Sequence, residues 1–519
     1  MTRPDQQATH TPPLCTALHN IIEHQAAIQP AGVALWWQGE PIDYATLQRN
    51  IISVSAQLSG SGVAGDRIAV LSWNSPEFVE LMYGVPAAGR ILVPLNARLA
   101  PAELAYQLQH SGVTMLFAEN ALLQPLLSHD ENLREMHTVL LGTQYTQWRD
   151  AAPVSGNGVQ QVSIHPDDPV WILFTSGSTG RPKGAILTHR SFLAGLKSAA
   201  LARPVARTDK YYYPFPLFHV SAHNVMLQHL YGAAVVLARS FDANDTLLAC
   251  RDLQVTTMSL APTMIAMLLA HPQFHADDLR SVRTIGYGAS AMPASLLQQL
   301  LAQTGVGLCQ SYGMTELSGS VAFLTVDDHQ QAAHQNPELL RSVGKPLPTA
   351  LIKLADDEGK PCAQGVCGEI LVKAEQCMRG YWHDEQATRL ALRDGWLHTG
   401  DIGYFDGQGY LYIVDRKKDM IISGGENIAS REIEEVMRRH DAVADCAVIG
   451  LPDPKWGESV SAVLVLKHEA GDEELLAHCR NFLAAYKTPK RWLRIEALPL
   501  NAAGKTDKPL LRRQFASAS

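Results

Sequence analysis

The sequence predicts an α/β protein with a large N-terminal body of several subdomains, an attached β unit and a small α+β C-terminal domain. Three observations support this prediction: the length of the chain, a recurring strand–helix–strand pattern, and a change to short strands with glycine-bearing turns after about Val343. A chain of 519 residues exceeds one hydrophobic core, because domains commonly hold about 100 to 200 residues. We therefore expect about two to four units.

The body is predicted from alternating strands and helices. Residues Ile68 to Ser72 have the apolar run of a buried strand, Ser75 to Gly89 the pattern of an amphipathic helix, and Ile91 to Pro94 the pattern of a second strand. Strand, helix and strand with short connections are typical of a parallel α/β layer. Further buried strands are predicted at residues 169–175, 233–238, 255–261 and 282–289.

The last third of the chain has a different pattern of predicted elements. The stretches "ALIKLADDEGKPC", "GEILVKA" and "GYFDGQGYLYIVDR" are short strands with glycine turns, which predict an antiparallel β unit. The charged run "RKKD" then predicts an exposed connector. Helices are expected at 430–440 and 474–486, with strands between them. We predict a body at 1–415, a hinge at 416–419 and a C-terminal lid domain at 420–519.

Composition limits the classes of partner. The net charge of −8 disfavours non-specific binding to nucleic acid or to an anionic membrane, since neither surface attracts an acidic protein. The 8 cysteines form no C-x-x-C pair of the kind that holds structural zinc, so reduced thiols are expected. Neither a signal peptide nor an apolar run of transmembrane length is found, which predicts a cytoplasmic protein without a transmembrane segment.

The stretch "TSGSTGRPKG", Thr175 to Gly184, combines hydroxyls, glycines and a lysine after a predicted strand. Its order differs from the P-loop G-x-x-x-x-G-K-[ST]. Glycines that relax the backbone let hydroxyls and N–H groups converge on an anion, and Lys183 adds a cation for phosphate oxygens. Composition alone also allows an ordinary Ser/Gly turn.

Four further stretches carry candidate chemistry. "QSYGMTE" places Tyr312 where it can stack on a base and Glu316 where it can hold magnesium. "GWLHTGDIG" offers Asp401 to ribose hydroxyls. Arg416 ends a predicted strand ahead of a glycine pair, and Lys505 follows a glycine near the end of the chain. Each of these, taken alone, is also compatible with an ordinary surface residue.

Together the five stretches resemble the adenylate-forming superfamily of acyl-CoA synthetases, luciferases and peptide-synthetase adenylation domains. The resemblance covers essentially the whole chain, with the motifs in order. It implies that the C-terminal domain is mobile and rotates between two half-reactions. In the phosphate loop, Ser178 stands where members of the superfamily commonly have threonine; a hydroxyl is kept.

The resemblance assigns roles to individual residues. It implies Lys505, His219, Glu316 and Thr175 as catalytic residues, with magnesium on Thr175 and Glu316, and Lys418 as the hinge residue. A tunnel for coenzyme A is implied at Gly424, Gly425 and Glu426. The residues implied in ATP binding are Thr175, Ser176, Gly177, Ser178, Thr179, Gly180, Lys183, Gly288, Ala289, Ser290, Gln310, Ser311, Tyr312, Gly313, Met314, Thr315, Asp401, Arg416 and Lys505.

The stretch "YYYPFPLFHVSAHNVM" corresponds to the wall of the carboxylate pocket in the family. Amino-acid-activating members have an aspartate after the position of Phe218, whereas this chain has His219, so amino-acid activation is disfavoured. The side chains of the predicted pocket include small, apolar and amide groups, which suit an aryl, cinnamic-type or short-to-medium aliphatic acid. The predicted pocket consists of His219, Val220, Ser221, His223, Asn224, Tyr287, Gly313, Met314, Leu317 and Gly319.

The expected activity is that of an ATP-dependent carboxylic acid:CoA ligase. The acid is joined to AMP with release of pyrophosphate, and the acyl group then passes to the thiol of coenzyme A. ATP, Mg²⁺ and coenzyme A are the expected co-substrates and cofactor, and a homodimer is left open. Two alternatives remain: an acyl-AMP ligase that loads the phosphopantetheine of a carrier protein, and a non-catalytic homologue that acts as a binding module.

Overall fold

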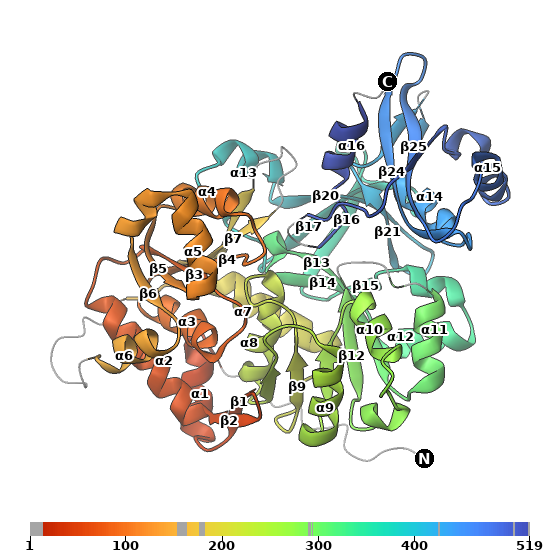
Figure 1. Cartoon of the computed structure of the whole chain (residues 1–519). Helices are drawn as coiled ribbons and strands as arrows, with labels where there is room; N and C mark the ends of the chain where they lie inside the picture. Colours follow the sequence, from red (N-terminus) through yellow and green to blue (C-terminus); the bar gives the residue numbers. More distant parts are fainter. Residues whose placement is uncertain are drawn as a thin grey trace. The chain divides into compact units, whose positions relative to one another are not determined.

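The computed structural model describes residues 14–152, 163–175, 182–288, 292, 294–423, 426–501 and 504–516 (Figure 1). Two compact units are found. The first contains the described residues of 1–175, 182–351 and 373–397, and the second those of 352–372 and 398–519. The predicted fold class, a large α/β body with a small C-terminal domain, is confirmed. The boundaries proposed at 415 and 419 stay predictions.

The first unit contains a large mixed sheet. The strands β10, β9, β11, β12 and β13 pair in parallel, while β13 pairs antiparallel with β14. In spatial order the strands are β15 (Lys345–Pro346), β14 (Gly319–Leu324), β13 (Gly307–Met314), β12 (Thr284–Gly288), β11 (Thr257–Ser259), β9 (Lys210–Tyr213), β10 (Ala234–Leu237), β1 (Val33–Trp37) and β2 (Glu40–Asp43).

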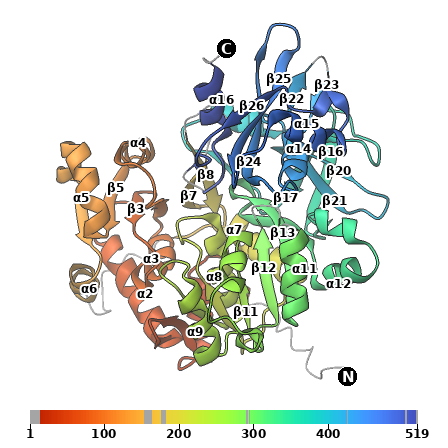
Figure 2. The same cartoon turned by 45° about the vertical axis from the view of Figure 1, so that its right-hand side comes forward.

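Helices pack on both faces of this sheet (Figure 2). One face buries a core in which Tyr212, Ile285 and Leu308 meet side chains of the helices α9 to α11. The other face carries Tyr211 and Ser259, which contact Arg203 at the end of α7. The helices are α7 (His189–Ala202), α8 (His223–Leu230), α9 (Ala243–Leu253), α10 (Pro262–Leu269), α11 (Ala294–Gln303) and α12 (Val326–His334).

A second sheet of the first unit contains the strands predicted nearest the N-terminus. The helix α3 (Pro76–Ala87) lies between the parallel strands β3 and β4, as expected. It begins there because the Ser75 hydroxyl accepts a hydrogen bond from the Phe78 N–H and Pro76 fits the first helical turn. In order the strands are β18 (Gly380–Tyr381), β8 (Lys183–Thr188), β7 (Pro169–Thr175), β4 (Ile91–Leu95), β3 (Arg67–Leu71), β5 (Val113–Ala118) and β6 (His137–Leu140).

The remaining helices of the first unit lie around these sheets. Leucines of α4 and α5 contribute to a core with the strands β3, β4 and β5. The helices are α1 (Asn20–Ile28), α2 (Tyr44–Ser59), α4 (Pro101–Ser111), α5 (Asn120–His129), α6 (Thr143–Asp150) and α13 (Glu385–Ala391).

The predicted β unit forms a sheet of short strands, in which β20 and β21 pair antiparallel. The C-terminal part has its own core, where Ile433 and Met437 of α14 pack against Val448 and Val460. The strands of the β unit are β16 (Ala350–Ala355), β17 (Gly368–Ala374), β19 (Leu392–Arg393), β20 (Trp396–Phe405) and β21 (Leu411–Arg416). The C-terminal elements are β22 (Ile421–Ser423), β23 (Glu426–Ile428), α14 (Ser430–Met437), β24 (Val443–Asp453), β25 (Gly457–Leu466), α15 (Asp472–Arg480), β26 (Arg491–Arg494) and α16 (Lys508–Ala516).

The helix predicted at 474–486 is shorter than expected, because α15 ends at Arg480. Beyond Arg480 the aromatic side chains are not buried: Phe482 is 56% exposed and Tyr486 is 45% exposed. A separate 3₁₀ turn, Ala485–Lys487, follows. The aromatic residues that made the helix look continuous therefore lie on the surface of the second unit.

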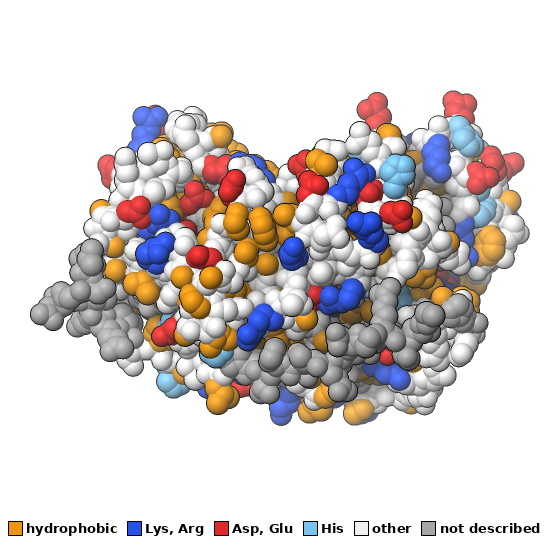
Figure 3. Space-filling model, turned by 90° about the horizontal axis from the view of Figure 1, so that it is seen from below, with side chains coloured by type: hydrophobic (Ala, Val, Ile, Leu, Met, Phe, Trp, Pro, Cys, Tyr) orange, Lys and Arg blue, Asp and Glu red, His pale blue; other side chains and the backbone are white. Residues whose placement is uncertain are grey.

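Figure 3 shows acidic and basic side chains interspersed over one face of the described part. Among the described helices, none combines the length and the apolar composition that crossing a membrane requires.

Candidate active site

A cluster around Glu316 forms where strands of the first unit end. Thr175 is the last residue of β7 and pairs in the ladder with Lys183, the first residue of β8. The Thr175 hydroxyl lies 3.4 Å from Glu316 Oε1 and 3.5 Å from the Lys183 carbonyl oxygen. The structure thus brings together Thr175, Lys183 and Glu316. The intervening loop residues Ser176, Gly177, Ser178, Thr179 and Gly180 lie outside the described residues.

Tyr381 completes this cluster, and sequence reasoning missed it. Its hydroxyl donates a hydrogen bond to Glu316 Oε1 at 2.9 Å, and the Lys183 ammonium lies 5.3 Å from the centre of its ring. Burial, and then the Glu316 carboxylate, raises the pKa of Tyr381, so the phenol stays protonated and donates. The two partners are 65 positions apart. No local pattern around Tyr381 points to this contact.

The donor set of this cluster fits magnesium. Glu316 supplies a buried carboxylate and Thr175 a hydroxyl, and oxygen atoms are the ligands that Mg²⁺ prefers. Over the described ranges, no group of three or more His, Cys, Asp or Glu side chains could hold a metal by itself. A magnesium ion at Glu316 would therefore need phosphate oxygens and water as further ligands, the usual arrangement where a nucleotide is bound.

The predicted adenine-binding residues lie along β13. Ser311 stands opposite Gly288 of β12, and Tyr312 is buried. Gly313 faces the backbone of β14 so closely that a Cβ built on it would lie 2.0 Å from the Gly319 carbonyl oxygen. Only glycine fits there. Gln310, Met314 and Thr315 continue the same segment, while Ala289 and Ser290 lie outside the described residues.

The predicted acid pocket begins with His219, whose ring centre lies 4.9 Å from that of Phe218 in an edge-on contact. A short turn at Val220 and Ser221 then leads into α8. The Ser221 hydroxyl lies 3.1 Å from the Tyr213 hydroxyl, and Asn224 Nδ2 donates to the Ser221 carbonyl oxygen at 3.0 Å. The turn is held by contacts within itself and to β9.

His223 lies next to two other predicted pocket residues. Its Nδ1 is 2.8 Å from the Val220 carbonyl oxygen and therefore carries the proton, which leaves Nε2 as an acceptor. A Cβ on Gly319 would lie 3.4 Å from that Nε2. Burial lowers the pKa of His223 to about 4, so the ring is neutral near pH 7. Leu317 is fully buried in the turn before Gly319.

Tyr287 is set apart from these residues. Successive side chains of a strand point to opposite faces of a sheet. Tyr287 packs into the core under α9 to α11, and its hydroxyl contacts His329 at 2.9 Å and Gln310 at 3.3 Å. Gly286 and Gly288 face the other side. A role for Tyr287 in the acid pocket stays a prediction, and the structure does not bring its side chain together with His223.

A second cluster of predicted residues lies in the second unit. Asp401 of β20 pairs in the ladder with Arg416 of β21, and Arg416 Nε lies 3.3 Å from Asp401 Oδ1. The pKa of Lys505 is lowered, first by burial of its ammonium group and then by the positive charge of Arg416. Lys505 as a whole residue is exposed, and the charges of Arg416 and Asp401 act on its ammonium group.

Lys418, the predicted hinge residue, belongs to the same neighbourhood. Its pKa is lowered, first by burial, with Arg416 and Arg512 adding to the effect and Asp419 opposing it. Glu426 is exposed, and Gly424 and Gly425 lie outside the described residues. Arg416, Lys418 and Lys505 thus concentrate positive charge near Asp401, and such a region can bind an anion.

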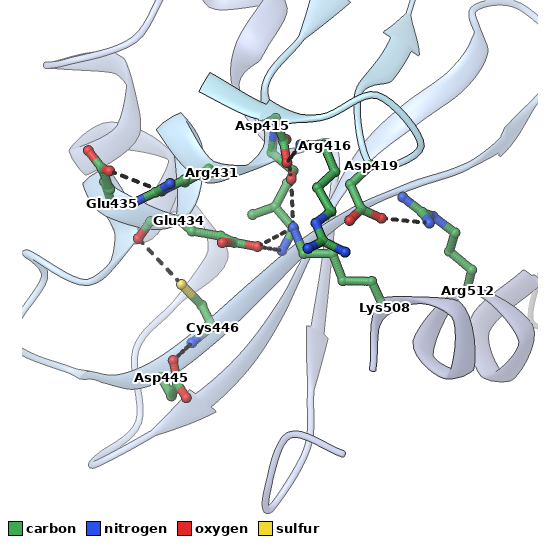
Figure 4. Close-up of polar contacts among 12 residues, drawn as sticks. Asp415, Arg416, Asp419, Arg431, Glu434, Glu435, Asp445, Cys446, Lys508 and Arg512 are labelled. Atoms are coloured by element: carbon green, nitrogen blue, oxygen red, sulfur yellow. Dashed lines mark hydrogen bonds and ion pairs between the residues drawn. The ribbon is translucent and has the colours of Figure 1, made fainter. Parts of the chain in front are cut away.

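A buried polar network adjoins the predicted hinge, and sequence reasoning missed it as well (Figure 4). Asp415 Oδ2 accepts hydrogen bonds from the Ser430 N–H at 2.7 Å and from the Ser430 hydroxyl at 2.6 Å. Lys508 donates to the Ser430 hydroxyl oxygen at 2.6 Å and pairs with Glu434 at 2.8 Å. We call Asp415, Ser430, Glu434 and Lys508 the hinge network; it ties β21 to α14 and α16.

Comparison with known proteins decides the family. Residues 22–382 match the AMP-binding enzyme family, and residues 432–505 match its C-terminal domain. The chain is an AMP-binding enzyme. The predicted membership in the adenylate-forming superfamily is confirmed.

Relatives of this AMP-binding enzyme are ligases. A feruloyl-CoA synthase of an Amycolatopsis species is 36% identical over 498 residues, which cover 95% of this chain and 97% of that protein. A fatty acid–[acyl-carrier-protein] ligase of Streptomyces coeruleorubidus is 34% identical, with 98% of both chains covered. The solved o-succinylbenzoate CoA synthetase of Bacillus subtilis, in complex with its acyl-adenylate intermediate, has a TM-score of 0.84 at 31% identity, covering 95% of this chain and 98% of that one.

The same Bacillus subtilis enzyme has been solved with ATP and a magnesium ion. The AMP-binding enzyme described here is thus an ATP-dependent member of the acyl- and aryl-CoA ligase family. The identities of its acid substrate and of its acyl acceptor depend on the side chains of this particular chain.

Proposed function

We propose that this AMP-binding enzyme activates an aryl, cinnamic-type or short-to-medium aliphatic acid as the acyl-adenylate and transfers the acyl group to free coenzyme A. The acid carboxylate attacks the α-phosphorus of ATP, and pyrophosphate leaves. The coenzyme A thiol then attacks the acyl carbon, and AMP leaves. No covalent enzyme intermediate is required.

Thr175, Lys183, Glu316 and Tyr381 are assigned to the phosphate end of ATP. Magnesium, held by Glu316 and Thr175, would supply positive charge beside the leaving phosphates. Tyr381 orients the Glu316 carboxylate by donating a hydrogen bond from its hydroxyl group to one carboxylate oxygen. Asp401 and Arg416 are assigned to the ribose, and Lys505 to neutralising the charge that develops during adenylation.

The choice of coenzyme A as the acceptor rests on one observation in the C-terminal part. Trp456 is 39% exposed, and two ammonium groups lie near its ring: Lys490 Nζ at 4.1 Å and Lys455 Nζ at 4.8 Å from the ring centre. An exposed indole beside cations suits a base with phosphates close by, because bases stack on aromatic rings. Free coenzyme A has an adenine and several phosphates, whereas a carrier-bound phosphopantetheine has no base.

The test separates the two steps. In the variant Trp456→Ala we expect the KM for coenzyme A to rise about tenfold, because loss of one stacked base costs about 1–3 kcal/mol. Pyrophosphate release with ATP and acid should stay unchanged. The matched control is Phe482→Ala, which removes another exposed aromatic ring beside a cation, Arg439 at 5.8 Å.

A carrier-protein acceptor is the second candidate, and the similarity to the Streptomyces coeruleorubidus ligase favours it. Thioester formation should be followed with free coenzyme A and, separately, with a phosphopantetheine-bearing carrier protein. Consumption of the carrier without consumption of free coenzyme A would replace our proposal by this alternative. Absence of pyrophosphate release with every class of acid would contradict both.

A further inference from the structure

Arg203 is a buried cation whose partners in the described residues are neutral. Only 9% of it is exposed. Its Nη1 donates to the Ser259 hydroxyl at 2.7 Å, and its Nη2 donates to the Thr257 hydroxyl at 2.8 Å and to the Met258 carbonyl oxygen at 2.6 Å. Its Cζ lies 5.2 Å from the centre of the Tyr211 ring. Its Nε is buried and has no hydrogen-bond partner there.

Two other shielded arginines of the first unit are paired with carboxylates. Arg90 contacts Asp66 at 2.5 Å, and Arg149 contacts Glu80 at 3.1 Å. This pairing is the rule, because a buried charge without a counter-charge loses its hydration and gains nothing in return. Arg203 departs from that rule while keeping a free N–H. A guanidinium in such surroundings attracts an anion.

The guanidinium lies on the same face of the sheet as the predicted acid pocket. Arg203 contacts positions 211, 257 and 259, and Gly286 lies beside its Nη1, since a Cβ there would be only 2.5 Å away. The next positions on this face, toward the carboxyl ends of the strands, are Tyr213 and Gly288. They lie about 6.6 Å further along their strands.

That next layer is part of the candidate site. The Tyr213 hydroxyl contacts Ser221 of the predicted pocket. Gly288 belongs to the predicted ATP site. Open α/β sheets bind ligands at the carboxyl ends of their strands. Arg203 therefore lies one layer beneath the predicted pocket, further from the carboxyl ends of the strands. Burial is the main cause of the low pKa of His223, and the positive charge of Arg203 lowers it further. This agrees with the proximity of the two side chains.

We propose that Arg203 is a specificity-determining residue, and that it selects an acid with a second carboxylate remote from the carboxyl group that is joined to AMP. This inference rests on the proposed function and names the substrate class of the same site. The second carboxylate would supply the counter-charge that the described side chains around Arg203 lack. A dicarboxylic acid is therefore favoured over the monoacid of the same shape.

The first experiment compares matched acids. 2-Succinylbenzoate and 3-benzoylpropionate differ only in the ring carboxylate, and adipate and hexanoate form an aliphatic pair. We expect the wild-type enzyme to prefer the diacid of at least one pair at least about tenfold in kcat/KM for pyrophosphate release. Arg203→Met should lower kcat/KM for that diacid about 10- to 100-fold, as expected for a hydrogen bond to a charged group, and leave its monoacid unchanged. Arg203→Lys should keep part of the preference.

Two further variants distinguish a local effect of the guanidinium from a general effect on folding. Gly286→Ala keeps the charge but displaces the guanidinium, because the new methyl group would lie 2.5 Å from Nη1; it should also reduce the preference. Arg389→Met removes an exposed arginine of the first unit, whose side chain is 71% exposed, and should change nothing. The KM for ATP reports whether each variant keeps its nucleotide site.

Equilibrium binding of the same acids, measured by calorimetry with AMP present, separates this inference from the proposed function. Tighter binding of a diacid that Arg203→Met abolishes, without turnover of any acid, supports the role of Arg203 and contradicts the ligase proposal. Turnover in which the monoacids are preferred, or in which Arg203→Met affects both acids of a pair equally, overturns the role of Arg203 and leaves the ligase proposal standing. A preference for ferulate over cinnamate that depends on Arg203, without any preference for a diacid, also overturns it.

Discussion

Around Glu316, the hydroxyl groups of Thr175 and Tyr381 contact a buried carboxylate, whereas around Asp401 the neighbours are the cations Arg416, Lys418 and Lys505. In the first cluster the Tyr381 phenol is fixed as a donor by burial. In the second, burial and then repulsion from Arg416 lower the pKa values of both lysines. The difference teaches that the first unit fixes the protonation state of its groups, while the second concentrates charge that an anion can neutralise.

The largest effect is expected for Lys505→Ala. If the cations near Asp401 stabilise the negative charge that develops on the phosphate oxygens during adenylation, removing this ammonium should slow pyrophosphate release about 10²- to 10³-fold. Thioester formation from a preformed acyl-adenylate should be retained. Single-turnover assays of the two steps measure this, with Lys183→Ala as a comparison that should have the smaller effect on adenylation. Equal loss of both steps would remove the distinction between the two clusters.

The neutral state of His223 in the first unit can be tested by measuring the free energy of unfolding at different pH values. Because the pKa of His223 is lowered to about 4 from 6.5, the folded protein binds fewer protons than the unfolded chain between those values. Its contribution to stability is therefore lost as the pH falls through this window, by about 2 kcal/mol between pH 7 and pH 5.

Denaturant unfolding of wild type and His223→Gln at both pH values measures that loss. The variant should show the smaller decrease on acidification. His165→Gln is the control, because His165 is exposed, with 70% of its side chain accessible. Identical pH dependence in all three proteins would mean that His223 is not held neutral by burial.

A smaller effect is expected for Tyr381→Phe. The change removes the hydroxyl that donates to Glu316 at 2.9 Å while keeping the ring next to Lys183. We expect about a tenfold rise in the magnesium concentration needed for half-maximal adenylation, since a hydrogen bond to a charged group is worth about 1.5–3 kcal/mol. Titration of Mg²⁺ at saturating ATP measures it. Loss of activity that no magnesium concentration restores would point to a packing role instead.

The smallest effect is expected for Ser430→Ala in the hinge network. The variant removes the hydroxyl that bridges Asp415 and Lys508, but it keeps the backbone N–H to Asp415 and the pair between Lys508 and Glu434. Unfolding of the C-terminal part should require about 1–2 kcal/mol less. Hydrogen exchange in α14 and α16 measures this locally, and exchange unchanged there would show that the network is already open in solution.

The sequence predicts those parts of the site that lie at the ends of strands. Thr175, Lys183 and Glu316 meet because β7, β8 and β13 begin or end where their motifs stand. Asp401 and Arg416 meet because one hairpin pairs them. In each case a local pattern fixes the position of the residue.

Other contacts could not be found this way. Tyr381 and Arg203 contact partners that are far away in the sequence, and no spacing rule connects either residue with its partners. The hinge network joins Asp415 and Lys508 through Ser430, 78 positions from Lys508. Tyr287 shows a different limit: which face of a strand a residue occupies depends on register, so Gly286 and Gly288 lie on the face that Arg203 contacts while Tyr287 faces the core.

The close approach of β13 and β14 has a consequence for enzyme engineering. At Gly313 the neighbouring backbone leaves no room even for a methyl group. If the predicted acid pocket extends to Gly313, its contour there is made by main chain, which mutagenesis cannot reshape without separating two strands. Libraries aimed at new acids should hold Gly313 constant and vary side chains such as Asn224 and Leu317, where a different acid can be accommodated by exchanging atoms instead of moving a sheet.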